Sequence, residues 1–280
     1  MKVLITGAGG QLGSALQTVL SDREVVGLNR AELDITNFDE VRAAVAAHCP
    51  NVVINCAAYT AVDLAENDEA GAFKLNADGP RNLATATAEL NIALVQVSTD
   101  YVFDGTGNRP YHENDQTNPQ SVYGRSKLAG EQFVASLNPR HFIARTAWLY
   151  HHEPANAKNF PKTMLAQSHR ELVKVVNDQH GSPTYAPHLA EAIAWLIETQ
   201  SYGVYHLAGG GQTTWFDLTR RLYQLFGVQT AVEPCTTDEF PRPAKRPAYS
   251  VLTTNQEPQV LLPPWEVGLA EFASAMQQAS

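Results

Sequence analysis

The stretch ITGAGGQLG at residues 5–13 decides the fold. It follows a short apolar run and opens a helical pattern, and its three glycines are spaced as G-x-x-G-x-x-G. Glycine lets the backbone turn sharply and approach a pyrophosphate, which then meets the free N–H groups at a helix start. Such a turn is, by itself, also compatible with a simple tight connection. Its place at the first strand-to-helix junction predicts a dinucleotide-binding loop. The predicted cofactor contacts in this loop are Gly7, Gly10, Gln11, Leu12 and Gly13.

Short apolar runs alternate with helical patterns along the first half of the chain. The predicted strands are 3–6, 24–28, 52–55, 93–98 and 142–145, and the predicted helices are 11–20, 38–48, 80–90 and 121–136. Strands that alternate with helices form right-handed βαβ units around a parallel sheet that is covered on both faces. The sequence therefore predicts an α/β fold with a doubly wound, Rossmann-like parallel sheet.

The alternation loosens after about residue 148, and the chain from about residue 229 is rich in proline and polar residues. A strand-like run at 171–176, a helix at 189–198 and a strand at 203–209 indicate a return to the sheet. We predict a dinucleotide-binding domain formed by 1–147 and 171–208. Residues 148–170 and 209–280 should form a smaller C-terminal substrate lobe over the carboxyl edge of the sheet, where ligands bind in such folds.

Net charge and composition limit which classes of binding partner and which cellular compartment fit this protein. The net charge of −9 over 280 residues argues against broad binding to nucleic acid or membrane, although Arg242, Lys245 and Arg246 form one small basic cluster. Three cysteines without a C-x-x-C motif indicate neither a disulfide framework nor a zinc site. The start MKVLITG does not resemble a signal peptide, and no apolar segment reaches the ~18 residues of a membrane span. We expect a cytoplasmic protein whose fold begins at residue 1 or 2.

The ends of the second and third predicted strands suggest which dinucleotide binds. Asn29 and Arg30 follow the second strand, where an acid would bind the ribose 2′-hydroxyl of NAD and an arginine accepts a 2′-phosphate. These two residues favour NADPH, with NADH as the other candidate and an exposed loop arginine as the plainer interpretation. Further predicted neighbours of the cofactor are Asp34, Ile35, Ala57, Ala58 and Tyr59.

The segment SVYGRSKLAG at 121–130 places Tyr123 and Lys127 one helical turn apart. A tyrosine with a pKa of roughly 10 needs a nearby cation to exchange protons near neutral pH. After the fourth strand come Ser98 and Thr99, of which the alternation of side chains lets one face the site. Together with a nicotinamide cofactor, these residues predict a carbonyl reductase. Tyr123 gives the proton, Thr99 positions the oxygen, and Lys127 binds the ribose and lowers the tyrosine pKa.

These motifs resemble those of the extended short-chain dehydrogenase/reductases, which carry T-G-x-x-G-x-x-G, a Ser/Thr after the fourth strand and Y-x-x-x-K. More narrowly, NCAAYTAVDLAE, LNADGPRNLA, RTAWLY, VVNDQHGSPTYA and RPAYSVL are similar to segments of the dTDP-4-dehydrorhamnose reductase family. The resemblance implies NADPH-dependent reduction of the 4-keto group of dTDP-4-dehydro-L-rhamnose, with Thr99, Tyr123 and Lys127 as the catalytic trio. It also implies that Asn76 lies near the cofactor and that the smaller lobe binds the nucleotide sugar. The implied substrate contacts are Thr99, Asp100, Tyr101, Val102, Phe103, Trp148 and Arg246.

The resemblance also has consequences for metal binding and for the oligomeric state. Some members of that family form a magnesium-linked dimer through a glutamate two residues beyond the third glycine, where this chain has Ala15. We therefore expect no metal requirement, and either a monomer or a homodimer that no metal bridges. His151 and His152 have no partner at metal-ligand spacing, and we expect solvated loop residues.

Three other functions occur among proteins with a similar fold or similar motifs. Nucleotide-sugar 4,6-dehydratases resemble one another in a Thr-Asp-Glu sequence, and Tyr101 in the third place disfavours dehydration. The regulatory subunit of methionine adenosyltransferase, from the same superfamily, is non-catalytic, whereas the intact trio favours an enzyme. Reductases of other nucleotide-linked 4-keto-6-deoxy sugars share most of these motifs, so the sequence leaves the sugar open.

Overall fold

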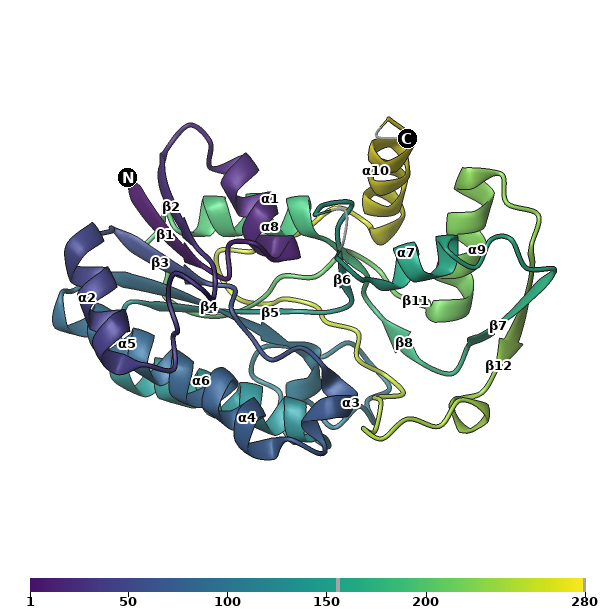
Figure 1. The fold of residues 1–280 in the computed structure, drawn as a ribbon. Helices are drawn as coiled ribbons and strands as arrows, with labels where there is room; N and C mark the ends of the chain where they lie inside the picture. Colours follow the sequence, from purple (N-terminus) through teal and green to yellow (C-terminus); the bar gives the residue numbers. More distant parts are fainter. Residues whose placement is uncertain (155–156, 279–280) are drawn as a thin grey trace.

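The computed structural model describes residues 1–154 and 157–278. Its central sheet has six parallel strands in the order β10-β5-β4-β3-β1-β2 (Figure 1). The chain runs from β1 to β2 on one side, then returns past β1 to β3 and continues outward, so the sheet is doubly wound as predicted. The strands are β1 (Lys2–Thr6), β2 (Glu24–Leu28), β3 (Val52–Asn55), β4 (Ala93–Thr99), β5 (His141–Thr146) and β10 (Gly203–His206).

Helices cover both faces of this sheet because its strands are apolar on both sides. Val3 and Ile5 of β1 face α1 (Gln11–Val19) and α8 (Ala186–Leu196). Leu4, between them, faces the opposite layer. That layer consists of α2 (Phe38–His48), α5 (Gly79–Glu89) and α6 (Val122–Leu137).

The connection from β3 to α5 holds helical segments that the sequence did not predict. They are α3 (Val62–Ala65), α4 (Glu69–Phe73) and the π-helical turn η1 (Lys74–Asp78). Segments of four or five residues are too short for a 3.6-residue apolar period to become visible. This connection matters because Tyr59, which precedes α3, and Lys74, which begins η1, both line the site described below.

The smaller lobe is built around its own apolar core, which includes Tyr150, Met164, Leu218 and Phe272. Three two-stranded sheets stabilise it, together with three helices seen to the right of the main sheet and above it in Figure 1. The sheets pair β6 (Leu149–Tyr150) with β9 (Thr184–Tyr185), β7 (Leu172–Val176) with β12 (Ala231–Cys235), and β8 (His180–Gly181) with β11 (Thr213–Thr214). The helices are α7 (Phe160–Leu165), α9 (Trp215–Phe226) and α10 (Trp265–Gln278).

The predicted domain boundary at residue 171 is wrong for β7. This strand pairs in parallel with β12, and Val173 and Val175 pack into the core of the smaller lobe. A strand-like run does not reveal its partner when that partner lies far along the chain. Within the predicted segment 171–208, α8 packs on the main sheet and β10 joins it, so the chain returns to the larger domain at about residue 186. No helix within 1–154 and 157–278 is long and apolar enough to cross a membrane.

Candidate active site

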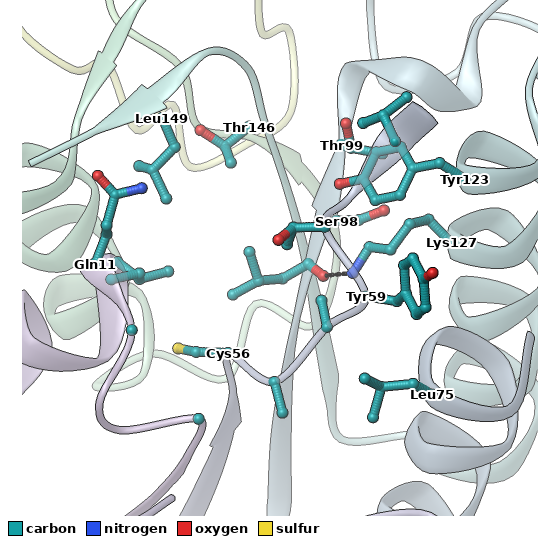
Figure 2. Close-up of a pocket in the computed structure, with 18 of the residues that line it drawn as sticks. Gln11, Cys56, Tyr59, Leu75, Ser98, Thr99, Tyr123, Lys127, Thr146 and Leu149 are labelled. Carbon is teal, nitrogen blue, oxygen red and sulfur yellow. Dashed lines mark hydrogen bonds between the residues drawn. The ribbon is translucent and has the colours of Figure 1, made fainter. Parts of the chain in front are cut away.

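A cavity of about 1040 Å³ lies where β1, β3, β4 and β5 end, between the main sheet and the smaller lobe. Figure 2 shows Tyr123, Lys127 and Thr99 on one side of it, with Gln11 and Leu149 opposite. Both parts of the molecule therefore contribute side chains to a single cavity.

The glycine-rich loop forms the bottom of this cavity and fits a dinucleotide. Gly7 has φ +68°, and a Cβ there would lie 2.7 Å from the backbone nitrogen of Ala57. A Cβ on Gly13 would lie 2.5 Å from the carbonyl oxygen of Gly7, so this glycine lets α1 begin against the loop. The first N–H groups of α1 have no partner within the helix, and they suit a pyrophosphate. Of the predicted contacts, Gly7, Gly10, Gln11, Leu12 and Gly13 all line the cavity.

The far end of the cavity carries the residues predicted to select the dinucleotide. Arg30 is exposed there and forms no salt bridge with any described residue. Asp34 accepts hydrogen bonds from Thr36 N at 2.9 Å and Thr36 Oγ1 at 2.8 Å, which lower the pKa of its carboxyl. Lys74 also lines this end, and its position in the sequence gave no signal for it. The other predicted neighbours that line the cavity are Asn29, Ile35, Ala57, Ala58 and Tyr59.

The proposed catalytic trio meets at the carboxyl end of β4. Thr99 ends that strand, and Tyr123 and Lys127 follow one turn apart on α6. Ser121 caps this helix, because its side chain accepts a hydrogen bond from Gly124 N at 3.1 Å. A Cβ on Gly124 would overlap the carbonyl oxygen of Tyr101, so glycine lets α6 approach the end of β4 closely. All three residues of the trio line the cavity.

The pKa values of Tyr123 and Lys127 in this structure differ from the prediction. Lys127 Nζ donates a hydrogen bond of 2.6 Å to the carbonyl oxygen of Val97, the dashed line in Figure 2. Burial lowers the pKa of Lys127 to about 8. Burial also raises the pKa of Tyr123 to about 12, opposed by the Thr99 hydroxyl and reinforced by Asp100. The pKa of the tyrosine is therefore raised overall and not lowered as predicted, because desolvation dominates.

Both hydroxyls at the end of β4 line the cavity, so the prediction that only one faces the site is wrong. The strand ends here and turns into η2 (Asp100–Val102), which breaks the alternation of faces. Ser98 Oγ is buried and has no hydrogen-bond partner among the described residues, and the same holds for Thr146 Oγ1 at the end of β5. Two buried hydroxyls without partners beside a cavity call for an explanation, and a functional role is one such explanation. Thr146, Val97, Leu149 and Cys56 line the cavity without having been predicted.

The side of the cavity that is predicted to hold the substrate is lined by side chains from distant segments. Trp148 stacks on Trp215 with ring centroids 3.4 Å apart and an interplanar angle of 6°, and both rings line the cavity. Arg246 lines it too, and its Nη2 lies 2.9 Å from Asp63 Oδ2. Asp100 and Tyr101, which were also predicted as substrate contacts, line the same cavity. Neither Trp215 nor Gln179, which also lines the cavity, was predicted.

Three predicted contacts lie behind the wall of the cavity instead of on it. Val102 and Phe103 are buried in a cluster with Tyr111, and neither lines the cavity. Asn76 is also buried; it accepts a hydrogen bond from Tyr59 N at 2.8 Å and donates one to Tyr59 O at 3.1 Å. These two hydrogen bonds connect Asn76 to Tyr59, which does line the cavity.

The expectation of a solvated loop is wrong for His151. This side chain is only 3% exposed, its Nδ1 lies 3.4 Å from Ser14 Oγ, and burial lowers its pKa to about 4. The neighbouring His152 is partly exposed, and its Nδ1 lies 2.7 Å from the hydroxyl of Tyr185. Both rings pack where the smaller lobe meets α1, a contact that local sequence does not reveal.

The comparisons with known proteins agree along nearly the whole chain. The family model described as RmlD substrate binding domain matches residues 1–278. A dTDP-4-dehydrorhamnose reductase of Streptomyces griseus is 43% identical over 98% of this chain and 93% of that protein. A Streptomyces antibioticus protein named "Probable dTDP-4,6-dihydroxy-2-methyloxan-3-one 4-ketoreductase" is 42% identical over 100% and 94%. The crystal structure of dTDP-4-dehydrorhamnose reductase from Bacillus anthracis in complex with NADP is 40% identical over 98% and 99%, with a TM-score of 0.94.

Proposed function

Because the chain belongs to the RmlD substrate binding domain family, we propose that it reduces the 4-keto group of dTDP-4-dehydro-L-rhamnose to give dTDP-L-rhamnose, with NADPH as reductant. The observation that carries this proposal is the convergence of Thr99, Tyr123 and Lys127 on the cavity that also contains the glycine-rich loop. A fold alone would not carry it, since one fold serves many functions.

The three residues of the trio have distinct roles in this reaction. NADPH, when bound, supplies the hydride that reaches the keto carbon. Tyr123 holds its proton at neutral pH, because its pKa is about 12, and gives it to the oxygen as charge develops there. Lys127 stays mostly protonated below its pKa of about 8 and stabilises the phenolate that remains. Thr99 orients the keto oxygen with its hydroxyl.

The two ends of the cavity have the chemistry that the two ligands require. Arg30 and Lys74 provide positive charge for a 2′-phosphate, which supports NADPH over NADH. Arg246 provides positive charge for the diphosphate of the sugar nucleotide, and Trp148 offers an apolar face to the sugar. The cavity of about 1040 Å³ lies at the upper end of the usual size range of ligand pockets.

The second candidate is a reductase of another nucleotide-linked 4-keto-6-deoxy sugar, which the Streptomyces antibioticus relative favours. Loss of NADPH absorbance, measured with a panel of such sugars, tests both candidates. The fastest turnover is expected with dTDP-4-dehydro-L-rhamnose, and a higher kcat/KM for another sugar would favour the second. Binding of NADPH without any turnover would instead indicate a non-catalytic subunit such as that of methionine adenosyltransferase.

Assembly and location follow the same proposal. We expect a cytoplasmic enzyme that needs no metal and exists as a monomer or as a homodimer that no metal bridges. Ala15, at the position that carries the metal-binding glutamate in some family members, is 2% exposed and packs among residues of α1 and α8. Nucleic acids and membranes are not expected partners, given the net charge of −9.

A further inference from the structure

Asp100 directly follows Thr99 in the chain and lies beside the catalytic trio. Thr99 Oγ1 donates a hydrogen bond to Asp100 Oδ1 at 2.9 Å and accepts one from Tyr101 N at 3.2 Å. Asp100 is 2% exposed, yet it lines the cavity, and its Oδ2 has no hydrogen-bond partner within 1–154 and 157–278. A buried carboxylate oxygen without a partner costs free energy, so the position invites a functional explanation.

The Thr99 hydroxyl faces two acids at once. It has a single proton, which it gives to Asp100, and it also interacts with Tyr123, whose pKa it lowers. While Asp100 is ionised, the Thr99 proton is engaged by the carboxylate. When Asp100 is neutral, the carboxyl can donate to the Thr99 oxygen, and the Thr99 proton is free to turn toward Tyr123. The protonation state of Asp100 thus decides whether Thr99 can donate to the tyrosine.

We propose that Asp100, acting through Thr99, returns a proton to Tyr123 after each reduction; this inference rests on the proposed function. Once the sugar oxygen has taken the tyrosine proton, the phenolate oxygen takes the proton of Thr99. The Thr99 oxygen in turn takes the proton of Asp100. One O–H bond breaks for each that forms, and Asp100 is left as a carboxylate that regains a proton from water in the cavity. Asp100 is a positioning residue, because it acts through Thr99 and not on the reacting carbon.

The surroundings of Asp100 favour this role near neutral pH. Burial raises the pKa of Asp100 to about 6, although the nearby hydroxyls of Ser250 and Thr99 oppose the rise. A proton donor works best when its pKa lies near the working pH. The titratable and charged groups around this carboxyl are Tyr101 on η2, Tyr123 on α6, and the Arg246–Asp63 ion pair beyond Tyr101.

The test separates the first turnover from the later ones. Asp100→Asn keeps an oxygen that accepts the Thr99 hydrogen bond but removes the acidic proton. In stopped-flow absorbance of NADPH, the variant should lose less rate in the first turnover than in steady state, because Tyr123 enters the first turnover protonated. Steady-state kcat should fall at least about tenfold, because the phenolate regains its proton slowly. In wild type kcat should decrease as pH rises above about 6, since the neutral form of Asp100 disappears, and the variant should lack this decrease.

A second variant, Ser250→Ala, keeps the acid and removes a hydroxyl that lowers its pKa. The decrease in kcat should then begin at a higher pH, and an unshifted profile would overturn the inference even if Asp100→Asn did not fold. Binding of NADPH, followed by its fluorescence, checks the fold of both variants. Unchanged kcat in Asp100→Asn would overturn the inference, and so would equal losses in the first turnover and in kcat, which would show a merely structural role. A wild-type protein that reduces no 4-keto sugar would instead overturn the proposed function and this inference together.

Discussion

The cavity has two walls, one predicted to bind the cofactor and one predicted to bind the substrate, and they differ in the groups that form them. Where it would meet a pyrophosphate, the cofactor wall consists largely of backbone: glycines without side chains, the N–H groups at the start of α1, and the ends of β1 and β3. The substrate wall consists of side chains such as Trp148, Trp215 and Arg246, which come from separate segments of the smaller lobe. A hydrogen bond of 2.8 Å from Asn159 Nδ2 to Gln11 Oε1 joins the smaller lobe to the cofactor wall. A binding site formed by backbone groups can therefore be recognised in one short stretch of sequence. A binding site formed by side chains from separate segments depends on tertiary packing.

The largest effect is expected where the two walls meet. Tyr123→Phe removes the phenolic proton and keeps the ring that packs edge-on against Tyr101 at 5.5 Å. We expect kcat to fall by ~10²–10⁴-fold, the usual contribution of a general acid, while the affinity for NADPH changes little. Steady-state kinetics and fluorescence titration measure the two quantities. A variant that retains more than about a third of wild-type kcat would remove the tyrosine from the mechanism.

The cofactor wall should be sensitive to a single methyl group. Gly13→Ala would place its Cβ against the backbone of Gly7 and Ala8, which no side-chain rotation can relieve. We expect a loss of about 1 to 3 kcal/mol in the free energy of unfolding, measured in urea, together with weaker NADPH binding. Gly9→Ala is the matched control, because its Cβ would meet no atom within 4 Å. Equal unfolding free energies for the two variants would contradict the account of this wall.

This contrast explains what the sequence could predict. Gly7, Gly10 and Gly13 lie within one strand-turn-helix unit, and Tyr123 and Lys127 lie on one helix, so local spacing was enough to predict that they line one site. Trp215 reaches Trp148 only through the packing of α9 against the rest of the smaller lobe, and no local pattern predicts that stack. Likewise β7 has an ordinary strand pattern, but its partner β12 follows after several other elements.

The pKa values of Tyr123 and Lys127 could not be predicted from the sequence either, because they also depend on tertiary packing. The spacing of Tyr123 and Lys127 predicted that the ammonium would favour the phenolate. Burial depends on the whole fold, and it raises the pKa of the tyrosine and lowers that of the lysine. Proximity in sequence therefore identified the pair, whereas its protonation required the three-dimensional structure.

Two arginines, one in each wall, should have separate effects on cofactor and substrate binding. Arg30→Ala should weaken NADPH binding by roughly 10- to 100-fold and leave NADH nearly unchanged, since only NADPH carries the 2′-phosphate. Arg246→Ala should leave both cofactors unchanged and raise the KM of the sugar nucleotide by about tenfold. Isothermal titration and steady-state kinetics separate these effects. Equal losses for NADPH and NADH in Arg30→Ala would make Arg30 a bystander.

The Arg246 result has a further control in its ion-pair partner. Arg246→Ala leaves the Asp63 carboxylate, previously 2.9 Å from the arginine, at the edge of the cavity without its cation. That negative charge would repel a diphosphate. Asp63→Asn combined with Arg246→Ala should therefore recover part of the lost affinity for the sugar nucleotide. No recovery would mean that Arg246 acts by contact with the substrate alone.

The smallest effect is expected from removing metal, because neither wall is expected to need one. Carboxylate oxygens are the usual protein ligands for magnesium, and the methyl group of Ala15 supplies none. The charge that moves during the reduction is already matched by Tyr123 and Lys127, so catalysis has no evident need for a cation. We therefore expect both kcat and association state to survive EDTA. Sedimentation and turnover, compared with and without chelator at one protein concentration, measure this. A dimer that dissociates, or a rate that collapses and returns with added magnesium, would show that other carboxylates hold a metal and that it belongs to the working enzyme.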